Sequence, residues 1–194
     1  MEKSLGRSRF TLVALFGLVV AAVASGQSFT EFVIPTAGSD PVGIAAGPDG
    51  NLWFIEQFTN KIGRITTAGV FMEFTIPTAG SFPYEIVTGP DANLWFTEFD
   101  ISANKIGRIT TAGVFTEFPI PTANSGPVWI TAGPDGALWF TEFNSNKIGR
   151  ITTGGTITEF PIPTASSDPY RIALGPDGNL WFVEGNRGQS CCLV

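Results

Sequence analysis

The chain has 194 residues and a net charge of −6 at pH 7, and its lysines and arginines are scattered singly. No basic patch exists, so neither nucleic acid nor an anionic membrane surface is expected as a partner. The sequence contains no histidine, the side chain most often used for proton transfer near neutral pH. Its many glycines, prolines and phenylalanines indicate β-structure with frequent turns, in one domain with a sizeable core.

The first predicted element, residues 1–24, is a signal peptide. A basic start is followed by an apolar run that closes on a small-x-small pattern: Lys3, Arg7 and Arg9, then residues 10–24, ending in Ala22-Val23-Ala24. The apolar run has 15 residues, fewer than the roughly 20 that a spanning helix needs. We therefore expect cleavage before Ser25 and a secreted protein, extracellular or periplasmic, with no membrane attachment after cleavage.

From residue 30 onward the sequence repeats with a period near 42. Four tryptophans follow one another at spacings of 42, 44 and 42: Trp53, Trp95, Trp139 and Trp181. Such a period predicts a repeat architecture. The repeats are units 30–71, 72–115, 116–157 and 158–184, followed by a divergent tail, 185–194, with no strand pattern. In the third unit the predicted strands are Val128–Ala132, Ala137–Glu142, Lys147–Thr152 and Ile157–Ile162.

A Gly-Pro-Asp-Gly turn joins the first two strands of a unit, and the bulky triplet Leu-Trp-Phe follows it. In the second unit Ala92 replaces the last glycine, at a cost of roughly 1 kcal/mol if that corner is left-handed. Three bulky residues in a row indicate a strand that is buried on both faces. Small four-stranded sheets covered on both faces and repeated at this period predict an all-β fold, a β-propeller of about four blades.

The ends of the repeated region leave the closure of the ring open. Residues Thr30–Ile34 match the last strand of a unit and are expected to close the ring as the outer strand of the last blade. Four blades closing alone, two chains completing a larger ring as a homodimer, and a truncated fragment are all alternatives. Cys191 and Cys192 are neighbours in the sequence, so they cannot join distant parts of the fold.

The repeat GPDGNLWFTE…NKIGRITT…ITEFPIPT resembles that of the streptogramin lyase (virginiamycin B lyase) family over nearly the whole chain after residue 24. The resemblance implies a seven-bladed propeller whose lyase members open a macrocyclic lactone by elimination, with a divalent cation, usually magnesium. It also implies a catalytic histidine in a Pro-His-x-Ile run and a glutamate that closes Leu-Trp-Phe-Thr-Glu.

Carried onto this chain, the resemblance gives the glutamates but not the histidine. The catalytic candidates are Glu98, Glu142 and Glu184, with Glu56 at the same place in the first unit. The histidine positions hold Val42, Tyr84, Val128 and Tyr170. Valine cannot take a proton, and tyrosine, with a pKa near 10, would need a large downward shift. The metal ligands are unknown, and Mg²⁺ is implied only by the resemblance.

The residues that vary between units follow the proline of the innermost strand. Five of them are candidate ligand-binding residues, with aromatic faces and a few polar groups suited to a small organic or sugar-like ligand: Tyr84, Glu85, Trp129, Tyr170 and Arg171. Unselected variation in an exposed rim is the alternative.

The residues that recur in every unit are expected to be structural. Asp49 and its equivalents are turn residues, the tryptophans are core, and the repeated Lys and Arg residues are expected to face carboxylates. The leading hypothesis for function is a ligand-binding or scaffold module without the family's lyase chemistry. The alternative is an active metal-dependent lyase or lactone hydrolase.

Overall fold

A computed structural model describes residues 28–185 and 189–193 of the chain, so the predicted signal peptide lies outside the described residues. The described residues fall into two units, one that contains residues 28–31 and one that begins at residue 32. Residues 28–31 of the first unit have no regular secondary structure, and the strands that the structure describes belong to the second unit. None of the described residues forms a helix that is long and apolar enough to cross a membrane.

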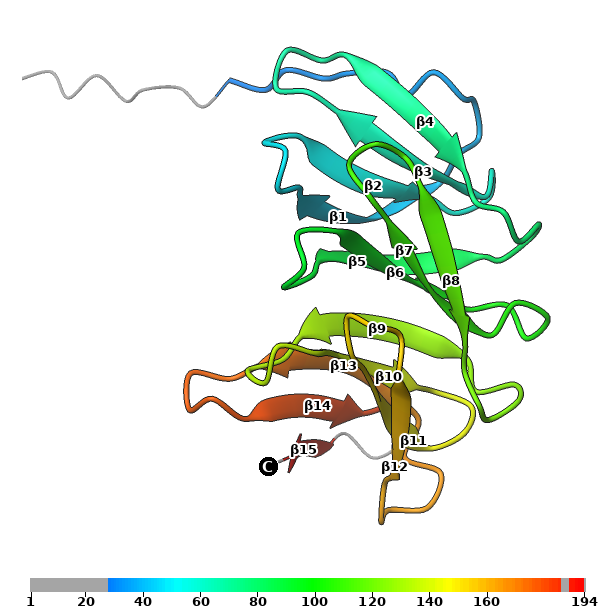
Figure 1. Ribbon diagram of the computed structural model, residues 1–194, viewed down its shortest axis with the longest axis vertical. Coiled ribbons are helices and arrows are strands. Elements are labelled where there is room, and N and C mark those ends of the chain that lie inside the picture. Colours follow the sequence, from blue (N-terminus) through cyan, green and yellow to red (C-terminus); the bar gives the residue numbers. More distant parts are fainter. Residues whose placement is uncertain (1–27, 186–188, 194) are drawn as a thin grey trace, which may run out of the picture. The chain divides into compact units, whose positions relative to one another are not determined.

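Four antiparallel sheets follow one another along the chain (Figure 1). The first holds β1 (Pro41–Ala46), β2 (Leu52–Glu56), β3 (Lys61–Ile65) and β4 (Phe71–Thr75). The second holds β5 (Pro83–Thr88), β6 (Leu94–Glu98), β7 (Lys105–Ile109) and β8 (Phe115–Pro119). The third holds β9 (Pro127–Ala132), β10 (Leu138–Glu142), β11 (Lys147–Ile151) and β12 (Ile157–Pro161), and the fourth holds β13 (Pro169–Leu174), β14 (Leu180–Glu184) and β15 (Gln189–Leu193).

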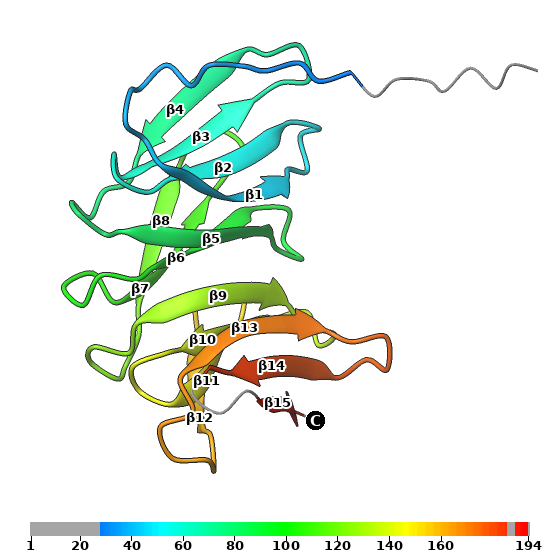
Figure 2. The same ribbon diagram turned by 180° about the vertical axis from the view of Figure 1, so that it is seen from behind.

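The first strands of successive sheets lie next to one another, β1 beside β5, β5 beside β9 and β9 beside β13, as both views show (Figures 1 and 2). Within each sheet the strands run up and down in sequence order. This is the blade arrangement of a β-propeller, so the predicted fold class is confirmed. The strands predicted for the third unit agree with β9 to β12 to within a residue at each end.

The Gly-Pro-Asp-Gly turn is built as its sequence predicts. Asp49 Oδ1 accepts a hydrogen bond from the indole Nε1 of Trp53 at 3.0 Å and one from the Asn51 amide at 3.3 Å. The turn therefore fixes the tryptophan that follows it, and the other three units repeat the aspartate–indole bond. Ala92 has a φ of 57° where Gly50 has 74°, which confirms the left-handed corner.

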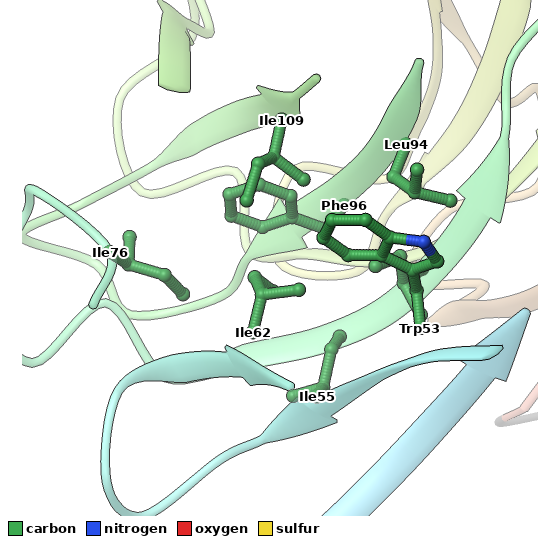
Figure 3. Packing of buried hydrophobic residues seen from close by; sticks show 8 residues of the cluster. Trp53, Ile55, Ile62, Ile76, Leu94, Phe96 and Ile109 are labelled. Carbon is green, nitrogen blue, oxygen red and sulfur yellow. The ribbon is translucent and has the colours of Figure 1, made fainter. Parts of the chain in front are cut away.

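The core lies between neighbouring sheets. Trp53 is fully buried, and it packs with Leu94 and Phe96 of the next sheet (Figure 3). Its ring also stacks on Phe74 of its own sheet, with 5.5 Å between the ring centroids. Trp95 is equally buried, whereas Trp181 in the last sheet is 42% exposed. Trp139 is partly buried and packs against the core. The prediction that all four tryptophans are core is thus wrong for Trp181, because no described sheet packs over that face.

The repeated charges pair with carboxylates, as expected. Lys61 and Lys105 each reach a glutamate of the outer strand at 2.8 Å. On the third strand, arginines pair with the turn aspartates; Arg150 Nε lies 2.6 Å from Asp135 Oδ2. These ion pairs are partly exposed and recur from sheet to sheet, so their contribution is to blade geometry rather than to a single site.

Two expectations for the chain ends are wrong. Residues 28–40 form no strand, so the segment Thr30–Ile34 does not act as an outer strand in this chain. The tail does contain a strand: β15 pairs antiparallel with β14 along its whole length. The cause is that the free edge of β14 offers backbone hydrogen bonds to any extended segment, whatever its side chains.

Candidate functional site

A cavity of about 380 Å³ lies at the starts of the four innermost strands. Its lining includes four of the five predicted ligand-binding residues, Tyr84, Glu85, Trp129 and Arg171, together with Val42, Gly43 and Ile44 of β1. The fifth, Tyr170, contacts the ring of Trp129 at a centroid distance of 6.5 Å and hydrogen-bonds to Tyr84. The structure therefore brings the five residues together, although they lie on three different strands.

A β-bulge turns these side chains away from the regular ladder. In the second sheet the pairing of β5 with β6 is interrupted between Pro83 and Ile86, so Tyr84 and Glu85 have no regular partners. Equivalent shifts occur in β1 and in β13, beside Val42 and Tyr170 respectively. The repeated proline marks the start of each bulge, which explains why the variable pair that follows it faces a common space.

Threonines of the second strands hold the bulges in place. The amide of Glu85 donates to Thr97 Oγ1 at 3.1 Å, and that hydroxyl donates to the Val128 carbonyl of the next sheet at 3.0 Å. In the third sheet Thr141 makes the same two bonds, to the amide of Trp129 and the carbonyl of Tyr170. The sequence interpretation missed this role, although threonine precedes glutamate in Leu-Trp-Phe-Thr-Glu of these two units.

Arg171 supplies the cavity with a positive charge. Its guanidinium lies over the Trp129 ring, 4.4 Å from the ring centroid, in a cation–π contact. Burial raises the pKa of the Glu85 carboxyl to about 7, against a lowering by the Ile86 amide and by Arg171. Gly43 permits the close approach of Glu85, because a Cβ on that glycine would lie 3.2 Å from Glu85 Oε1. The cavity thus holds a stacked cation and an acid that is half ionised near pH 7.

Tyr84 and Tyr170 are in direct contact. Their hydroxyls hydrogen-bond to each other, and their rings meet edge to face at a centroid distance of 6.1 Å. The bond to Tyr170, with burial, raises the pKa of the Tyr84 hydroxyl to about 12. The Tyr84 hydroxyl therefore keeps its proton at neutral pH. Two more of the histidine positions hold Val42 and Val128, whose side chains cannot take a proton.

An aromatic arc extends from the tyrosine pair across the loops that adjoin it. Phe99 lies 6.4 Å from Tyr84, and Phe143 lies 6.3 Å from Tyr170, between ring centroids. Phe82 continues the arc to Phe58, whose side chain is 65% exposed. Sequence reasoning did not single out these phenylalanines. Their position in the repeat could have identified them, since Phe99 and Phe143 directly follow the glutamate that ends Leu-Trp-Phe-Thr-Glu.

The predicted catalytic glutamates lie elsewhere. Glu98, Glu142 and Glu184 are buried, and none of them lines the cavity. Burial raises the pKa of Glu98 to about 8 and that of Glu142 to about 7. Neither oxygen of Glu98 has a partner at full hydrogen-bonding geometry, whereas Ser145 donates to Glu142 Oε2 at 2.7 Å. Each carboxyl lies at the end of the second strand of its sheet. Glu98 is near the ion pair of Lys105 and Glu117, and Glu142 is near the ion pair of Lys147 and Glu159.

The donor set does not fit a divalent cation. The described residues hold no group of three or more histidine, cysteine, aspartate or glutamate side chains arranged for a metal. The cavity offers the single carboxyl of Glu85, and it lies beside the cation Arg171. Glu98 and Glu142 are fully enclosed. The described residues at the cavity therefore do not provide a magnesium site.

Comparisons with known proteins agree with this architecture. The model of the virginiamycin B lyase family matches residues 19–191. A virginiamycin B lyase from Staphylococcus aureus is 50% identical, with a TM-score of 0.82 over 85% of this chain and 56% of that protein. A streptogramin B lyase is 42% identical, with a TM-score of 0.78 over 85% of this chain and 58% of that chain.

A catalytically inactive histidine-to-alanine variant of the S. aureus enzyme has also been solved with quinupristin, and it matches this chain equally well, at 50% identity. A putative gluconolactonase, at 16% identity and a TM-score of 0.60, shares the fold alone. The chain spans 56–58% of the length of these lyases. With the family model matched over most of the chain, this protein belongs to the virginiamycin B lyase family.

Proposed function

We propose that this chain is a secreted ligand-binding module that holds a small organic ligand in the cavity without the lyase chemistry of its family. The observation that carries the proposal is the convergence of Trp129, Arg171, Glu85 and Tyr84 on one space. Aromatic walls with a few fixed polar groups are typical of sites for organic ligands. The phenylalanines of the aromatic arc offer further apolar surface beside the cavity.

Lyase chemistry as the family performs it would need the histidine, which this chain does not contain. An elimination needs a group with a pKa near the working pH beside the proton that is removed. The chain has no histidine, and the pKa of Tyr84 moves upward, to about 12. Quinupristin is the ligand in the structure of the inactive S. aureus variant, so that variant binds the ligand without turnover. Quinupristin is therefore a suitable probe for binding without ring opening in this chain.

The test is a titration of the protein with quinupristin by calorimetry, followed by recovery of the ligand for mass and chromatographic analysis. We expect binding of one ligand per cavity and recovery of the intact ring. Arg171→Met removes the stacked cation, and we expect it to weaken binding about tenfold, which corresponds to about 1.4 kcal/mol. Arg64→Met is the matched control, since Arg64 also lies over a tryptophan, Trp53, but does not line the cavity.

A second candidate function rests on Glu85. An acid with a pKa of about 7 that lines the cavity can take a proton at neutral pH. In an elimination, Glu85 would take the proton from the carbon next to the one that bears the ester oxygen. The C–O bond would then break, and the carboxylate product would form beside Arg171.

Mass analysis separates the candidates. An elimination opens the ring without changing the mass of the ligand, a hydrolysis adds one water, and binding alone leaves the ring closed. Ring opening that is lost in Glu85→Gln would establish the second candidate. Ring opening that is lost in Glu98→Gln or Glu142→Gln but persists in Glu85→Gln would instead support a catalytic role for the glutamates that the family resemblance implied.

A further inference from the structure

We propose that Phe82 is a ligand-contacting residue, which presents its ring to a flat apolar group of the ligand just outside the cavity. The proposal rests on the proposed function and adds the kind of ligand to it: a molecule with a polar part for the cavity and a flat apolar part beside it. Two observations carry it, the left-handed backbone at Phe82 and the ring contacts that lead from Phe82 to the cavity.

The residue before the proline of each inner strand occupies a left-handed corner. Asp40, Phe82, Gly126 and Asp168 have φ angles of 49°, 50°, 61° and 50°. In the second unit the carbonyl of Phe82 accepts a hydrogen bond from the amide of Phe99 at 3.3 Å, and the other three units repeat this bond. The repeat therefore imposes the conformation on this position, whatever side chain the position carries.

Phenylalanine is poorly suited to that corner. Glycine adopts a left-handed conformation freely, and aspartate tolerates it better than most residues that have a Cβ. These are the residues of the other three units, whereas a bulky residue at a positive φ is an outlier. Residues held in unfavourable backbone conformations are concentrated at functional sites.

The packing of the sheets does not require a ring at this corner. The third and fourth sheets carry Gly126 and Asp168 there, and β9 and β13 still lie beside the inner strands that precede them. The phenylalanine is thus neither the residue that the backbone favours nor one that the junction between sheets needs. Its role therefore lies in what its ring contacts.

Phe82 belongs to a row of rings that reaches the cavity. Its centroid lies 6.3 Å from that of Phe99, which lies 6.4 Å from that of Tyr84, a residue of the cavity lining. On the other side Phe58 lies 6.0 Å from Phe82. Phe58 follows β2 and Phe82 precedes β5, so the row bridges the first two sheets, which pack on each other within this chain.

The row is also accessible. The ring of Phe82 is only partly buried, and Phe58 is 65% exposed. The cavity itself, at about 380 Å³, is near the lower end of the roughly 300–1,000 Å³ that small-molecule sites span. A ligand larger than the cavity extends past Tyr84, and aromatic rings there favour a flat apolar group that can stack on them.

The test measures quinupristin binding by calorimetry and the melting temperature on the same samples. Phe82→Asn removes the ring and places a residue that tolerates the left-handed corner. We expect the affinity to fall about tenfold, while the melting temperature changes by about 2 °C or less, because relief of the backbone offsets the lost ring contacts. Phe82→Asp should behave in the same way, and Phe82→Tyr, which keeps a flat ring, should keep the affinity.

Ala92→Gly is the matched control. It also relieves a left-handed corner of the second unit, where φ is 57°, but Ala92 does not line the cavity. We expect it to raise the melting temperature and to leave the affinity for quinupristin unchanged. A ring that served the fold alone would change the melting temperature of the Phe82 variants and not their affinity.

The possible failures are distinct. If Phe82→Asn binds quinupristin as tightly as the unmodified chain, the role of Phe82 is overturned and the proposed function stands. A loss of affinity in Phe82→Asp but not in Phe82→Asn would mean that the added charge weakens binding, which also overturns the role of the ring. An unmodified chain that does not bind quinupristin would overturn both proposals.

Discussion

At the scale of single residues, the buried glutamates stand out because burial works against their ionisation. Glu98 is fully buried, and burial together with the charge of Glu117 raises its pKa from 4.5 to about 8, although Lys105 opposes the shift. The folded protein therefore holds a proton at Glu98 that the unfolded chain releases at much lower pH. Such a group stabilises the fold below a pH of about 4.5, and this stability is lost as the pH rises through 8.

We expect Glu98→Gln to raise the free energy of unfolding at pH 8.5, by an amount on the order of a few kcal/mol at most, because glutamine keeps the shape and carries no charge. The gain should shrink toward pH 5, and thermal melts across this range measure it. Glu117→Gln is the control. Burial raises the pKa of Glu117, but hydrogen bonds from Lys105 and Thr78 outweigh it and lower the pKa, so this variant should lose stability at neutral pH. A Glu98→Gln protein that melts lower than the unmodified chain at pH 8.5 would contradict the assignment.

Ala92 carries strain that its equivalents avoid. Its φ of 57° lies in the left-handed region, which a residue with a Cβ occupies at a cost of roughly 1–2 kcal/mol. Ala92→Gly should therefore raise the melting temperature by about 2–4 °C. The reverse change, Gly136→Ala at the same corner of the third sheet, has open space around the new methyl group and should lower it by a similar amount. Equal melting temperatures for Ala92→Gly and the unmodified chain would show that the corner is not strained.

At the scale of elements, the bulge at the start of each inner strand is what creates the cavity. Thr97 joins the bulge of β5 to β9 by two hydrogen bonds, and Thr141 joins β9 to β13 in the same way. In the first sheet Ile55 occupies this position and makes no such bond. The threonines therefore act as positioning residues, since they hold Glu85 and Trp129 at the cavity without lining it.

We expect Thr97→Val to leave the amide of Glu85 and the carbonyl of Val128 without their partner, at a cost of about 1–3 kcal/mol in stability. Because the bulge is then free to shift, quinupristin should also bind more weakly than to the unmodified chain. Calorimetry and thermal melts on the same samples check both effects. Thr116→Val, on the outer strand β8, is the control for the loss of a threonine hydroxyl. Normal ligand affinity in a destabilised Thr97→Val protein would mean that the bond serves the fold and not the site.

The sequence predicted elements well wherever a local rule decided them. The repeat spacing and the Gly-Pro-Asp-Gly turns gave the strands of the third unit nearly to the residue, because turn chemistry and the buried Leu-Trp-Phe triplet are local signals. The sequence analysis did not predict β15, since pairing with the edge of β14 depends on the backbone rather than on side chains. It also missed Thr97, because a hydrogen bond between sheets leaves no pattern along one strand.

At the scale of the whole molecule, the five variable residues did predict the cavity. Their position after the repeated proline placed them at the starts of the inner strands. The propeller arrangement then brings the starts of neighbouring inner strands close together. The ring closure could not be predicted, because each repeat specifies only the contact with its neighbour.

The central claim is that the starts of the inner strands form a ligand site that binds without opening the ligand. A crystal structure of the chain grown with quinupristin tests it most directly. The account predicts an intact macrocycle against Trp129 and Arg171, within reach of Glu85. An opened ring, or a ligand bound away from the inner strands with the cavity empty, would contradict it.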